Sequence, residues 1–460
     1  MKISKQQIGL VLGILIAIIV AYIPLAGLSH EGQICLALTL MTVVFWAFQI
    51  AQPGYVAGVY LALLVIFQVA KPDVVFSPWV GTTMYLVIGA YLIAGAVKSS
   101  GFGERIAYSF ILKFVKGYKS IIVSIFILTF VLSILIPHPW PRAFLIMSVI
   151  AVVITSANLS KADAAKIGFT VFASSVPVSL IFLTGDSVIN PLAVEASGQS
   201  ISWLQWFVYM GVPNIISSIL TCLLILVLFK PSSVFIIDKE EIRAKLKSMG
   251  KLTQTEIRTI IWLVIAIVLW MTDSIHGIDI GWITLIIAML MSFPIIGKVL
   301  TPKNWADVPM HVLIFLTAAI SIGRVGAVTG MNTWLADTIL PSTVSSNIFL
   351  LALFITVIAI VIHMVLGSVI AVMGIVIPAI LIFTEPMGLN PIVPTLIVYT
   401  AIALHYIFPF HHLNILVGQG EENGMYSQKE VLRLGIPLTV VVFIIILLIE
   451  IPWWKMIGLL

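Results

Sequence analysis

The chain has 460 residues, of which 61% are apolar and only 9% are charged, and its formal net charge is +5. A soluble protein of this length needs a far more charged surface, so the composition excludes a soluble globular fold. The basic residues lie mostly in short loops between apolar blocks. That distribution argues against a nucleic-acid partner and predicts a protein whose solvent is the lipid bilayer.

Long uncharged blocks predict an all-α polytopic membrane protein. About 18 or more apolar residues suffice to cross a hydrocarbon core of about 30 Å as a helix. The block 8–28 is longer than a signal-peptide core of about 7–15 residues, so we expect it to remain as a first span. We expect about 11 transmembrane helices, at 8–28, 33–50, 54–70, 81–97, 164–192, 205–229, 258–275, 280–297, 309–328, 391–417 and 434–452.

Two further apolar stretches, 121–160 and 345–384, are broken in the middle. In the first, residues 137–142 contain three prolines, which cannot continue a helix. Its arms of about 16 residues reach roughly 24 Å, slightly short of a full span. We therefore predict two re-entrant hairpins, the first entering from the cytoplasm and the second, with its break near 363–368, from outside. Two short full spans are the alternative for the first stretch.

Basic residues predict the orientation, because cytoplasmic loops of membrane proteins are enriched in Lys and Arg. Lys2 and Lys5 place the N-terminus in the cytoplasm, whereas loops such as 194–202 and 341–347 carry neither residue type, with Lys71 as an outward exception. We expect a multi-pass protein of the inner (cytoplasmic) membrane. The cytoplasmic clusters are Lys98, Arg105, Lys113, Lys116 and Lys119; Lys230, Lys239, Arg243, Lys245, Lys247, Lys251 and Arg258; and Lys298 and Lys303.

The sequence contains an internal repeat with a shift of about 229–230 residues. Under this shift 85–103 falls on 314–332, the first hairpin on the second, and 169–173 on 399–403. An odd number of spans in each half gives the halves opposite orientations, which is the inverted-repeat design of secondary transporters. We expect an extra N-terminal span 1–30, a first repeat 31–230 (hairpin 121–160, broken helix 164–192), a cytoplasmic linker 231–257 and a second repeat 258–460 (hairpin 345–384, broken helix 391–417).

Four breaks in the apolar segments concentrate the polar chemistry: the two hairpin tips and the turns within the two broken helices. Non-helical backbone at membrane depth is tolerated only where it is buried in protein or lines a wet cavity. Helix N-termini created there direct partial positive charge and free N–H groups to one place, which suits an anion. The candidate substrate-binding residues are His138, Pro139, Trp140 and Arg142; Thr184, Gly185 and Ser187; Gly367 and Ser368; and Pro409, His411, His412 and Asn414. The candidate coupling residues are Asp186, His138 and His411.

Ionisable residues at membrane depth cost free energy and are usually functional. Each of those named here could nevertheless have a purely structural role. Arg142 could extend toward the cytoplasm or pair with Asp186, and Asp186 could serve that pair alone. His411 and His412 could be polar packing in an unwound turn, and the second tip has the same alternative. Three further residues are interpreted as structural, at helix ends or between helices: His311, Arg324 and His405.

At the four breaks the chain resembles the divalent anion:sodium symporter family of the ion transporter superfamily, and the likeness covers nearly the whole chain. It extends to segment 101–119 and to the returns 201–206 and 426–429. In that family each hairpin tip carries a Ser-Asn-Thr motif that helps to bind sodium and the substrate carboxylates. The matching positions here are His138, Pro139 and Trp140 at the first tip, and Ser368, Val369 and Ile370 at the second. Of the motif residues only one serine, Ser368, is kept.

The family's Thr-Pro-Pro-Asn turn is also altered: Asn414 matches its last residue, and Gly185, Asp186 and Ser187 replace the first copy. In the family, a sodium ion at the first tip supplies positive charge beside the anion. Arg142 would supply that charge permanently, and a fixed guanidinium does not leave with the substrate. We therefore expect weak or no sodium dependence at the first site. Histidines near a carboxylate would instead couple protons, and exchange of anions is equally open.

The resemblance implies a secondary active transporter, not an enzyme. It would move a small anion by alternating access of a transport part against a scaffold, and would form a homodimer through the scaffold. Dicarboxylates, tricarboxylates, sulfate and an aromatic or amino-acid-like anion are all open as substrates. No cofactor is expected beyond Na⁺ or H⁺ as coupling ion, and no partners beyond the anion, the bilayer and a second copy.

Two other classes of protein are alternatives. Broken helices also build the selectivity filters of channels, which an anion channel would need. A membrane metalloenzyme would need metal ligands, but His405, His411 and His412 fit no metal-binding spacing. Cys35 and Cys222 lie inside apolar runs and are interpreted as small hydrophobes, not as a disulfide or a metal pair.

Overall fold

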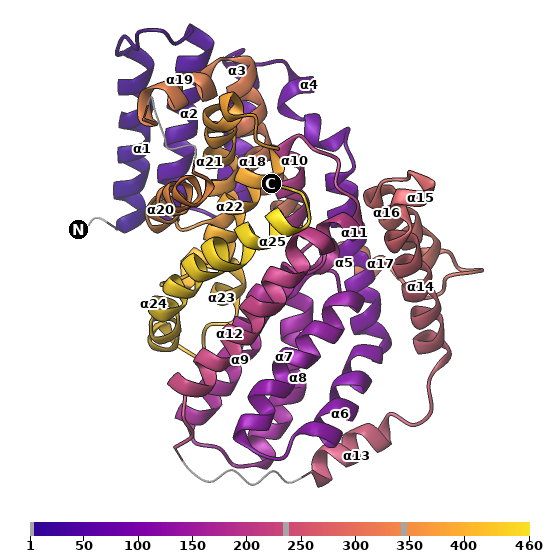
Figure 1. Cartoon of the computed structure of the whole chain (residues 1–460). Coiled ribbons are helices and arrows are strands. Elements are labelled where there is room, and N and C mark those ends of the chain that lie inside the picture. The colour runs from indigo at the N-terminus through magenta and orange to yellow at the C-terminus, as the bar shows by residue number, and fades with distance from the viewer. Residues whose placement is uncertain (1–3, 233–238, 342–346) are drawn as a thin grey trace.

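The structure is a computed structural model that describes residues 4–232, 239–341 and 347–460. Lys2, part of the predicted linker 231–257, most of loop 341–347 and the start of hairpin 345–384 lie outside these residues. The described chain folds as a bundle of helices without a β-sheet (Figure 1). This confirms the predicted all-α fold class.

The helices of the N-terminal half are α1 (Lys5–Tyr22), α2 (His30–Ala47), α3 (Pro53–Ile66), α4 (Pro72–Val75), α5 (Thr83–Ser100), α6 (Phe102–Phe114), α7 (Tyr118–Leu135), α8 (Pro139–Ser156), α9 (Lys161–Ser179), α10 (Ile189–Ser197), α11 (Trp203–Trp206) and α12 (Val212–Leu228). Those of the C-terminal half are α13 (Glu240–Ser248), α14 (Gln254–Met271), α15 (Asp273–His276), α16 (Ile280–Ser292), α17 (Pro302–Ala306), α18 (Met310–Val328), α19 (Met331–Ile339), α20 (Ile348–Leu366), α21 (Val369–Thr384), α22 (Ile392–Ala403), α23 (Leu413–Val417), α24 (Gln428–Ile444) and α25 (Ile451–Met456). Short 3₁₀ turns lie at Ser77–Trp79, Leu183–Gly185, Glu385–Met387 and Pro409–His411, and wide π turns join α11 to α12 and α24 to α25.

Within the described residues, 11 helices are long and apolar enough to cross a membrane. The count agrees with the prediction, but the members differ. The four hairpin arms α7, α8, α20 and α21 are among the 11. Four predicted spans are not: α3, α16 and α22 are shorter apolar helices, and α9, in the predicted span 164–192, is also outside the 11. Whether the hairpin arms cross the bilayer or re-enter it stays a prediction.

Helix ends follow local chemistry and recur between the halves. Gly101 is the C-cap of α5 with φ +81°, and Gly330, the residue after the C-cap Thr329 of α18, has φ +75°. A left-handed backbone favours glycine, and it turns the chain directly into the next helix, α6 or α19. The two glycines correspond under the shift of about 229–230 residues found in the sequence.

Helix pairs also recur under this shift. Helix α5 packs against α16 and α3 packs against α18, so each pair joins the two halves. Because α3 corresponds to α16 and α5 to α18, each pair maps onto the other. The pairs α7–α9 and α20–α22 correspond in the same way. A pseudo-twofold axis between the halves would produce such exchanges. The predicted division at 31–230 and 258–460 stays a prediction.

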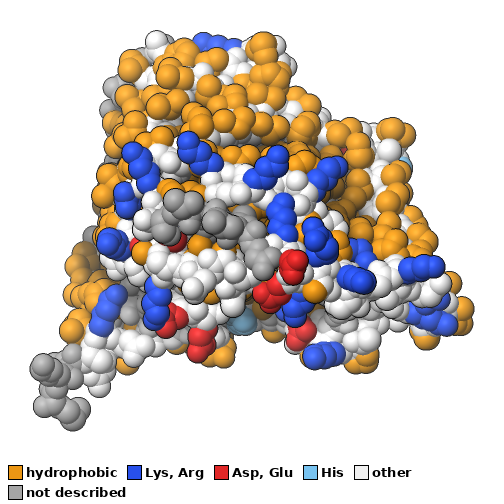
Figure 2. All heavy atoms as spheres, turned by 90° about the horizontal axis from the view of Figure 1, so that it is seen from below, with side chains coloured by type: hydrophobic (Ala, Val, Ile, Leu, Met, Phe, Trp, Pro, Cys, Tyr) orange, Lys and Arg blue, Asp and Glu red, His pale blue; other side chains and the backbone are white. Residues whose placement is uncertain are grey.

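Lys and Arg side chains gather on one face of the molecule. Figure 1 shows α6, α13 and the ends of α7, α8, α9 and α12 at its lower end. Seen from that end, Lys and Arg are spread over the face and hydrophobic side chains dominate beyond them (Figure 2). On this face Arg105 of α6 forms an ion pair with Glu256 of α14. Nε of Arg105 lies 2.6 Å and Nη2 3.1 Å from the Glu256 carboxylate.

We expect Glu256→Gln to lower the stability of the protein. Gln still caps α14 through Thr253, as Glu256 does, but it leaves the Arg105 guanidinium without its carboxylate. The side chains of Arg105 and Glu256 are only 16% and 1% exposed, so the loss should be about 1–3 kcal/mol. Thermal unfolding of the purified protein in detergent measures it.

The matched control is Glu421→Gln. Glu421 pairs with Lys161 at 3.2 Å, but these side chains are 85% and 93% exposed, so little change is expected. Equal effects of the two substitutions would contradict a structural role for the Arg105–Glu256 pair.

Candidate functional site

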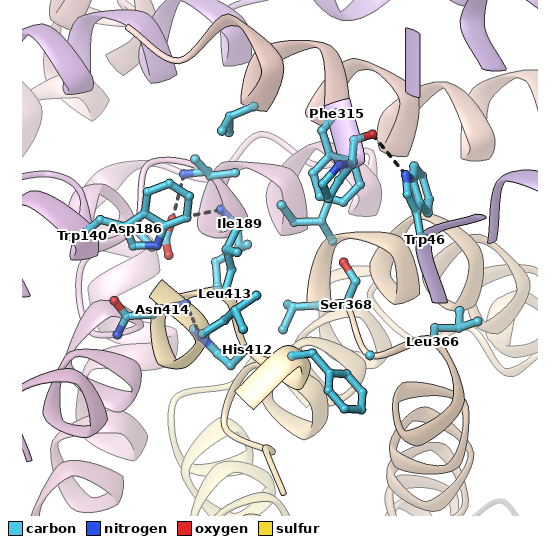
Figure 3. A pocket seen from close by; sticks show the side chains of 18 of the residues that line it. Trp46, Trp140, Asp186, Ile189, Phe315, Leu366, Ser368, His412, Leu413 and Asn414 are labelled. Carbon is cyan, nitrogen blue, oxygen red and sulfur yellow. Dashed lines mark hydrogen bonds between the residues drawn. The ribbon is translucent and has the colours of Figure 1, made fainter. Parts of the chain in front are cut away.

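One cavity lies where both hairpin tips and both breaks in the broken helices meet. Its lining combines apolar and aromatic side chains with a few polar groups, as sites for small molecules do. Figure 3 shows Asp186 and Trp140 of the first half on one side of it and Ser368 of the second tip on the other. The predicted site residues that line it are His138, Pro139, Trp140, Asp186, Gly367, Ser368, His412 and Asn414.

Aromatic side chains from regular helices complete the cavity wall. Trp46 of α2 and Phe315 of α18 meet edge to face with ring centroids 5.0 Å apart, and Trp46 Nε1 donates to the Pro53 carbonyl. The hydroxyl of Tyr91 on α5 is hydrogen-bonded to Nε2 of His138. These aromatic residues were not predicted from the sequence, because within an apolar helix no local signal distinguishes a cavity wall from packed core.

The first tip is joined to the first break by the side chain of Arg142, which is fully buried. Its Nη1 donates to the carbonyl oxygens of Ile136 and Gly185, at 3.2 Å each. Its Nη2 donates to Oγ of Ser179 at 2.6 Å. The guanidinium therefore satisfies backbone oxygens at two places where the helices are interrupted.

Arg142 does not line the cavity, so it lies behind the wall and not beside a ligand. Among the ion pairs of the described residues there is none between Arg142 and Asp186. The predicted part of Arg142 in substrate binding is therefore indirect in this geometry and stays a prediction.

The first break is held open by Asn190. Its Nδ2 donates to the carbonyl oxygens of Ser179 and Phe182 at 2.9 Å and of Leu183 at 3.3 Å. Its Oδ1 accepts a hydrogen bond from the hydroxyl of Tyr399 on α22. One amide thus binds carbonyls at the end of α9 and in the turn that follows it, and it ties the first broken helix to the second.

The second tip is formed by Gly367 and Ser368. Gly367 ends α20 with φ +62°, and a Cβ on it would lie 2.5 Å from the ring of Phe410. Ser368 is the N-cap of α21, and its Oγ accepts from the Ala371 N–H at 3.4 Å. This tip begins a helix of 16 residues at the cavity wall.

The second break is organised by buried histidines and one amide. Nε2 of His363 lies 2.9 Å from the carbonyl oxygen of His411, and its Nδ1 lies 3.2 Å from Nδ1 of His405. Nδ2 of Asn414 donates to the Phe172 carbonyl on α9 at 2.9 Å, so this break is tied to the first broken helix in return. Within the described part of the chain, no group of three or more His, Cys, Asp or Glu is arranged to hold a metal ion.

The remaining predicted site residues lie behind the cavity wall. Thr184 Oγ1 accepts from Nε1 of Trp203 at 3.0 Å, and the Ser187 N–H donates to the Pro137 carbonyl at 3.2 Å. Together with these, the residues that do not line the cavity are Arg142, Thr184, Gly185, Ser187, Pro409 and His411. Their contacts support the shape of the site, and their roles stay predictions.

A family of known membrane proteins matches the chain over almost its whole length. The family is described as the sodium:sulfate symporter transmembrane region, and it matches residues 4–460. The chain belongs to this family. The match confirms the resemblance to divalent anion:sodium symporters and makes the protein a multi-pass membrane transporter, not an enzyme.

Relatives of this transporter act on carboxylates. It is 28% identical to the citrate/succinate antiporter of Escherichia coli (strain K12) over 284 residues, 56% of this chain and 55% of that protein. It is 27% identical to dicarboxylate transporter 1, chloroplastic, of Spinacia oleracea over 344 residues, 72% of this chain and 60% of that protein. The solved YdaH transporter of Alcanivorax borkumensis shares the fold, with TM-score 0.55 and 14% identity over 94% of this chain and 99% of that chain.

We expect Asn190→Asp to destabilise the transporter and to lower transport at least tenfold. The carboxylate keeps the shape of the amide but cannot donate to the carbonyls of Ser179 and Phe182, of which the second keeps the N–H of Gly185. A buried polar group that loses its partner costs about 1–3 kcal/mol. Thermal unfolding and uptake into liposomes measure the two effects. The matched control is Asn423→Asp, an exposed residue that donates only to the Gln419 carbonyl at 3.3 Å. If both variants behave alike, Asn190 does not hold the break.

Proposed function

We propose that this protein is a secondary active transporter of small organic anions, di- or tricarboxylates, across the cytoplasmic membrane. The observation that carries the proposal is the cavity between the two tips and the two breaks, where α21 begins. Helix N-termini offer N–H groups and partial positive charge to an anion. The relatives named for citrate, succinate and dicarboxylates support this substrate class.

The proposal divides the chain into a scaffold and a transport part that moves against it. The scaffold comprises α1–α3, α5, α14, α16 and α18 and would form a homodimer. The transport part comprises the hairpins, the broken helices and the spans that follow them. The N-terminus would lie in the cytoplasm, and the gathering of Lys and Arg on one face supports that orientation (Figure 2).

Coupling at the first tip would not use sodium. The carbonyl oxygens of Ile136 and Gly185 are acceptors of the kind that coordinate a cation, and the guanidinium of Arg142 already occupies them. A fixed cation at this place leaves no position for an exchangeable one. The site would then drive transport by proton coupling or by anion exchange. The buried histidines at the second break supply titratable groups for the first mechanism, and the antiporter among the relatives supports the second.

Uptake of labelled succinate by purified protein in liposomes should be the same, within about twofold, with sodium or choline outside at fixed pH. We further expect Arg142→Ala to free the carbonyls of Ile136 and Gly185, so that sodium raises the unfolding temperature of the variant but not of the native protein. Sodium-driven accumulation by the native protein would overturn the proposed role of Arg142. Absence of uptake of any carboxylate would overturn the proposed function.

A contact between the two proposed parts lies away from the cavity. Glu195 of α10 forms an ion pair with Arg324 of α18, and its Oε2 accepts from Thr83 Oγ1 of α5 at 3.0 Å. Arg324 lies nine residues beyond Phe315 of the cavity wall, or about 13 Å along the helix. The transport part is therefore held to the scaffold at one end of α18, while the cavity reaches Gln49 and Pro53 near the other.

We expect Arg324→Gln to shift the equilibrium from the state seen here toward the state in which the cavity opens to the other side. The ion pair with Glu195 stabilises the present state, and the substitution removes it. The side chains of Arg324 and Glu195 are 41% and 20% exposed, so the equilibrium constant should change only several-fold. The rate at which an impermeant thiol reagent labels Ser368→Cys from each side of a liposome measures it, since Cys35 and Cys222 are buried. Lys161→Gln, which breaks an exposed pair, is the control. An unchanged labelling rate would contradict a role of the Glu195–Arg324 ion pair in stabilising this state.

A further inference from the structure

The cavity is chemically unequal at its two ends, and this inequality bears on the substrate. Among its described lining residues there is one carboxylate, Asp186, and neither Lys nor Arg. Resting on the proposed transport of carboxylates, we infer that the preferred substrate is a carboxylate that also carries a hydrogen-bond donor, a hydroxyl or an ammonium group. Asp186 would accept from that donor and so determine specificity.

Asp186 presents an acceptor to the cavity. Its Oδ1 accepts from the N–H groups of Val188 and Ile189, at 2.9 and 3.2 Å, which fixes the carboxylate at the start of α10. Figure 3 shows these two bonds and the second oxygen beyond them. Within the described residues Oδ2 accepts no hydrogen bond, and Asp186, which is 5% exposed, lines the cavity. A hydroxyl or ammonium group of a ligand at this end would donate to Oδ2.

The first tip adds few donors that could offset this acceptor. Helix α8 starts with Pro139 and has Pro141 in its first turn, and neither residue has an N–H group. Nε2 of His138 is bonded to Tyr91, and Arg142 is turned toward carbonyl oxygens behind the wall. Among these side chains only Nδ1 of His138, which has no partner within the described residues, is left to bind a ligand.

The second half of the cavity presents donors. His412 is 6% exposed, and its Nδ1 accepts from the N–H of Asn414 at 3.2 Å. In the neutral ring the proton must then lie on Nε2, which is buried and has no hydrogen-bond partner within the described residues. The first N–H groups of α21, at Val369 and Ile370, have no helical partner and also lie in the wall. These groups suit a carboxylate.

The two ends together describe the substrate. A carboxylate binds at the second tip between His412 and the start of α21, and a donor on the same molecule reaches Asp186. Apolar side chains such as Phe315 and Leu413 also line the cavity, where they would contact the carbon chain of the ligand. Hydroxy- and amino-carboxylates meet all three requirements, and a carboxylate without a donor leaves Asp186 unpaired.

Succinate, L-malate and L-aspartate test this directly, because they share a carbon chain and two carboxylates and differ only in H, OH or NH₃⁺ at carbon 2. We expect L-malate, L-aspartate or both to bind at least tenfold more tightly than succinate, as hydrogen bonds to a charged group require. Ligand-dependent shifts in unfolding temperature of the purified protein give the affinities, and inhibition of labelled succinate uptake checks them.

Asp186→Asn keeps an oxygen that can accept from Val188 and Ile189 but removes the charge, so the preference should fall below about threefold. Asp307→Asn, at an exposed position outside the cavity, should leave it unchanged. Equal affinity of the native protein for all three ligands would overturn the inference and leave carboxylate transport standing, as would an equal loss for all three in Asp186→Asn. Failure to bind or transport any of the three would overturn both proposals.

Discussion

The structure depends on one constraint: a backbone polar group at membrane depth needs a partner inside the protein. The chain interrupts its helices at four places and must satisfy the carbonyl and N–H groups that the interruptions release. Side chains do this locally. Arg142 and Asn190 bind carbonyls around the first tip and first break, and His363 lies in hydrogen-bond distance of the His411 carbonyl at the second break. The cavity can exist only because these bonds remove the need for water or a continuous helix at its rim.

The two halves meet this constraint with different chemistry. The first half uses a permanent cation, and prolines at its tip remove N–H groups from the start of α8. The second half uses neutral or titratable imidazoles, and its tip keeps a serine N-cap and a helix start with all its N–H groups. An inverted repeat would give equivalent ends to the cavity, but these substitutions leave one end with an acceptor and the other with donors. A symmetric backbone therefore surrounds an asymmetric ligand site.

The same bonds decide which helices can move together. Asn190 of the first break reaches Tyr399 on α22, and Asn414 of the second break reaches the Phe172 carbonyl on α9. Each broken helix is thus fastened to the other, so displacement of one without the other would expose buried amides. By contrast, Glu195 on α10 meets Arg324 on α18 through a partly exposed ion pair, which can break at small cost. The buried amide contacts therefore join the two broken helices into one body, whereas the ion pair attaches that body to α18 by a contact that breaks more easily.

Local and periodic signals in the sequence determined the class of fold, the places of the four breaks and the repeat. Hydropathy over about 18 residues indicates a span whatever packs around it, and the prolines beside His138 prevent α7 from continuing by their own covalent geometry. Only the tertiary structure decided where each side chain points. Arg142 and Asp186 are equally visible in the sequence, yet one is turned to carbonyls behind the wall and the other to the cavity. Trp46, Tyr91 and Phe315 joined the site because their helices pack beside the breaks. The rotation of a helix and the choice of its neighbours depend on contacts between residues far apart in the chain, which no single segment specifies.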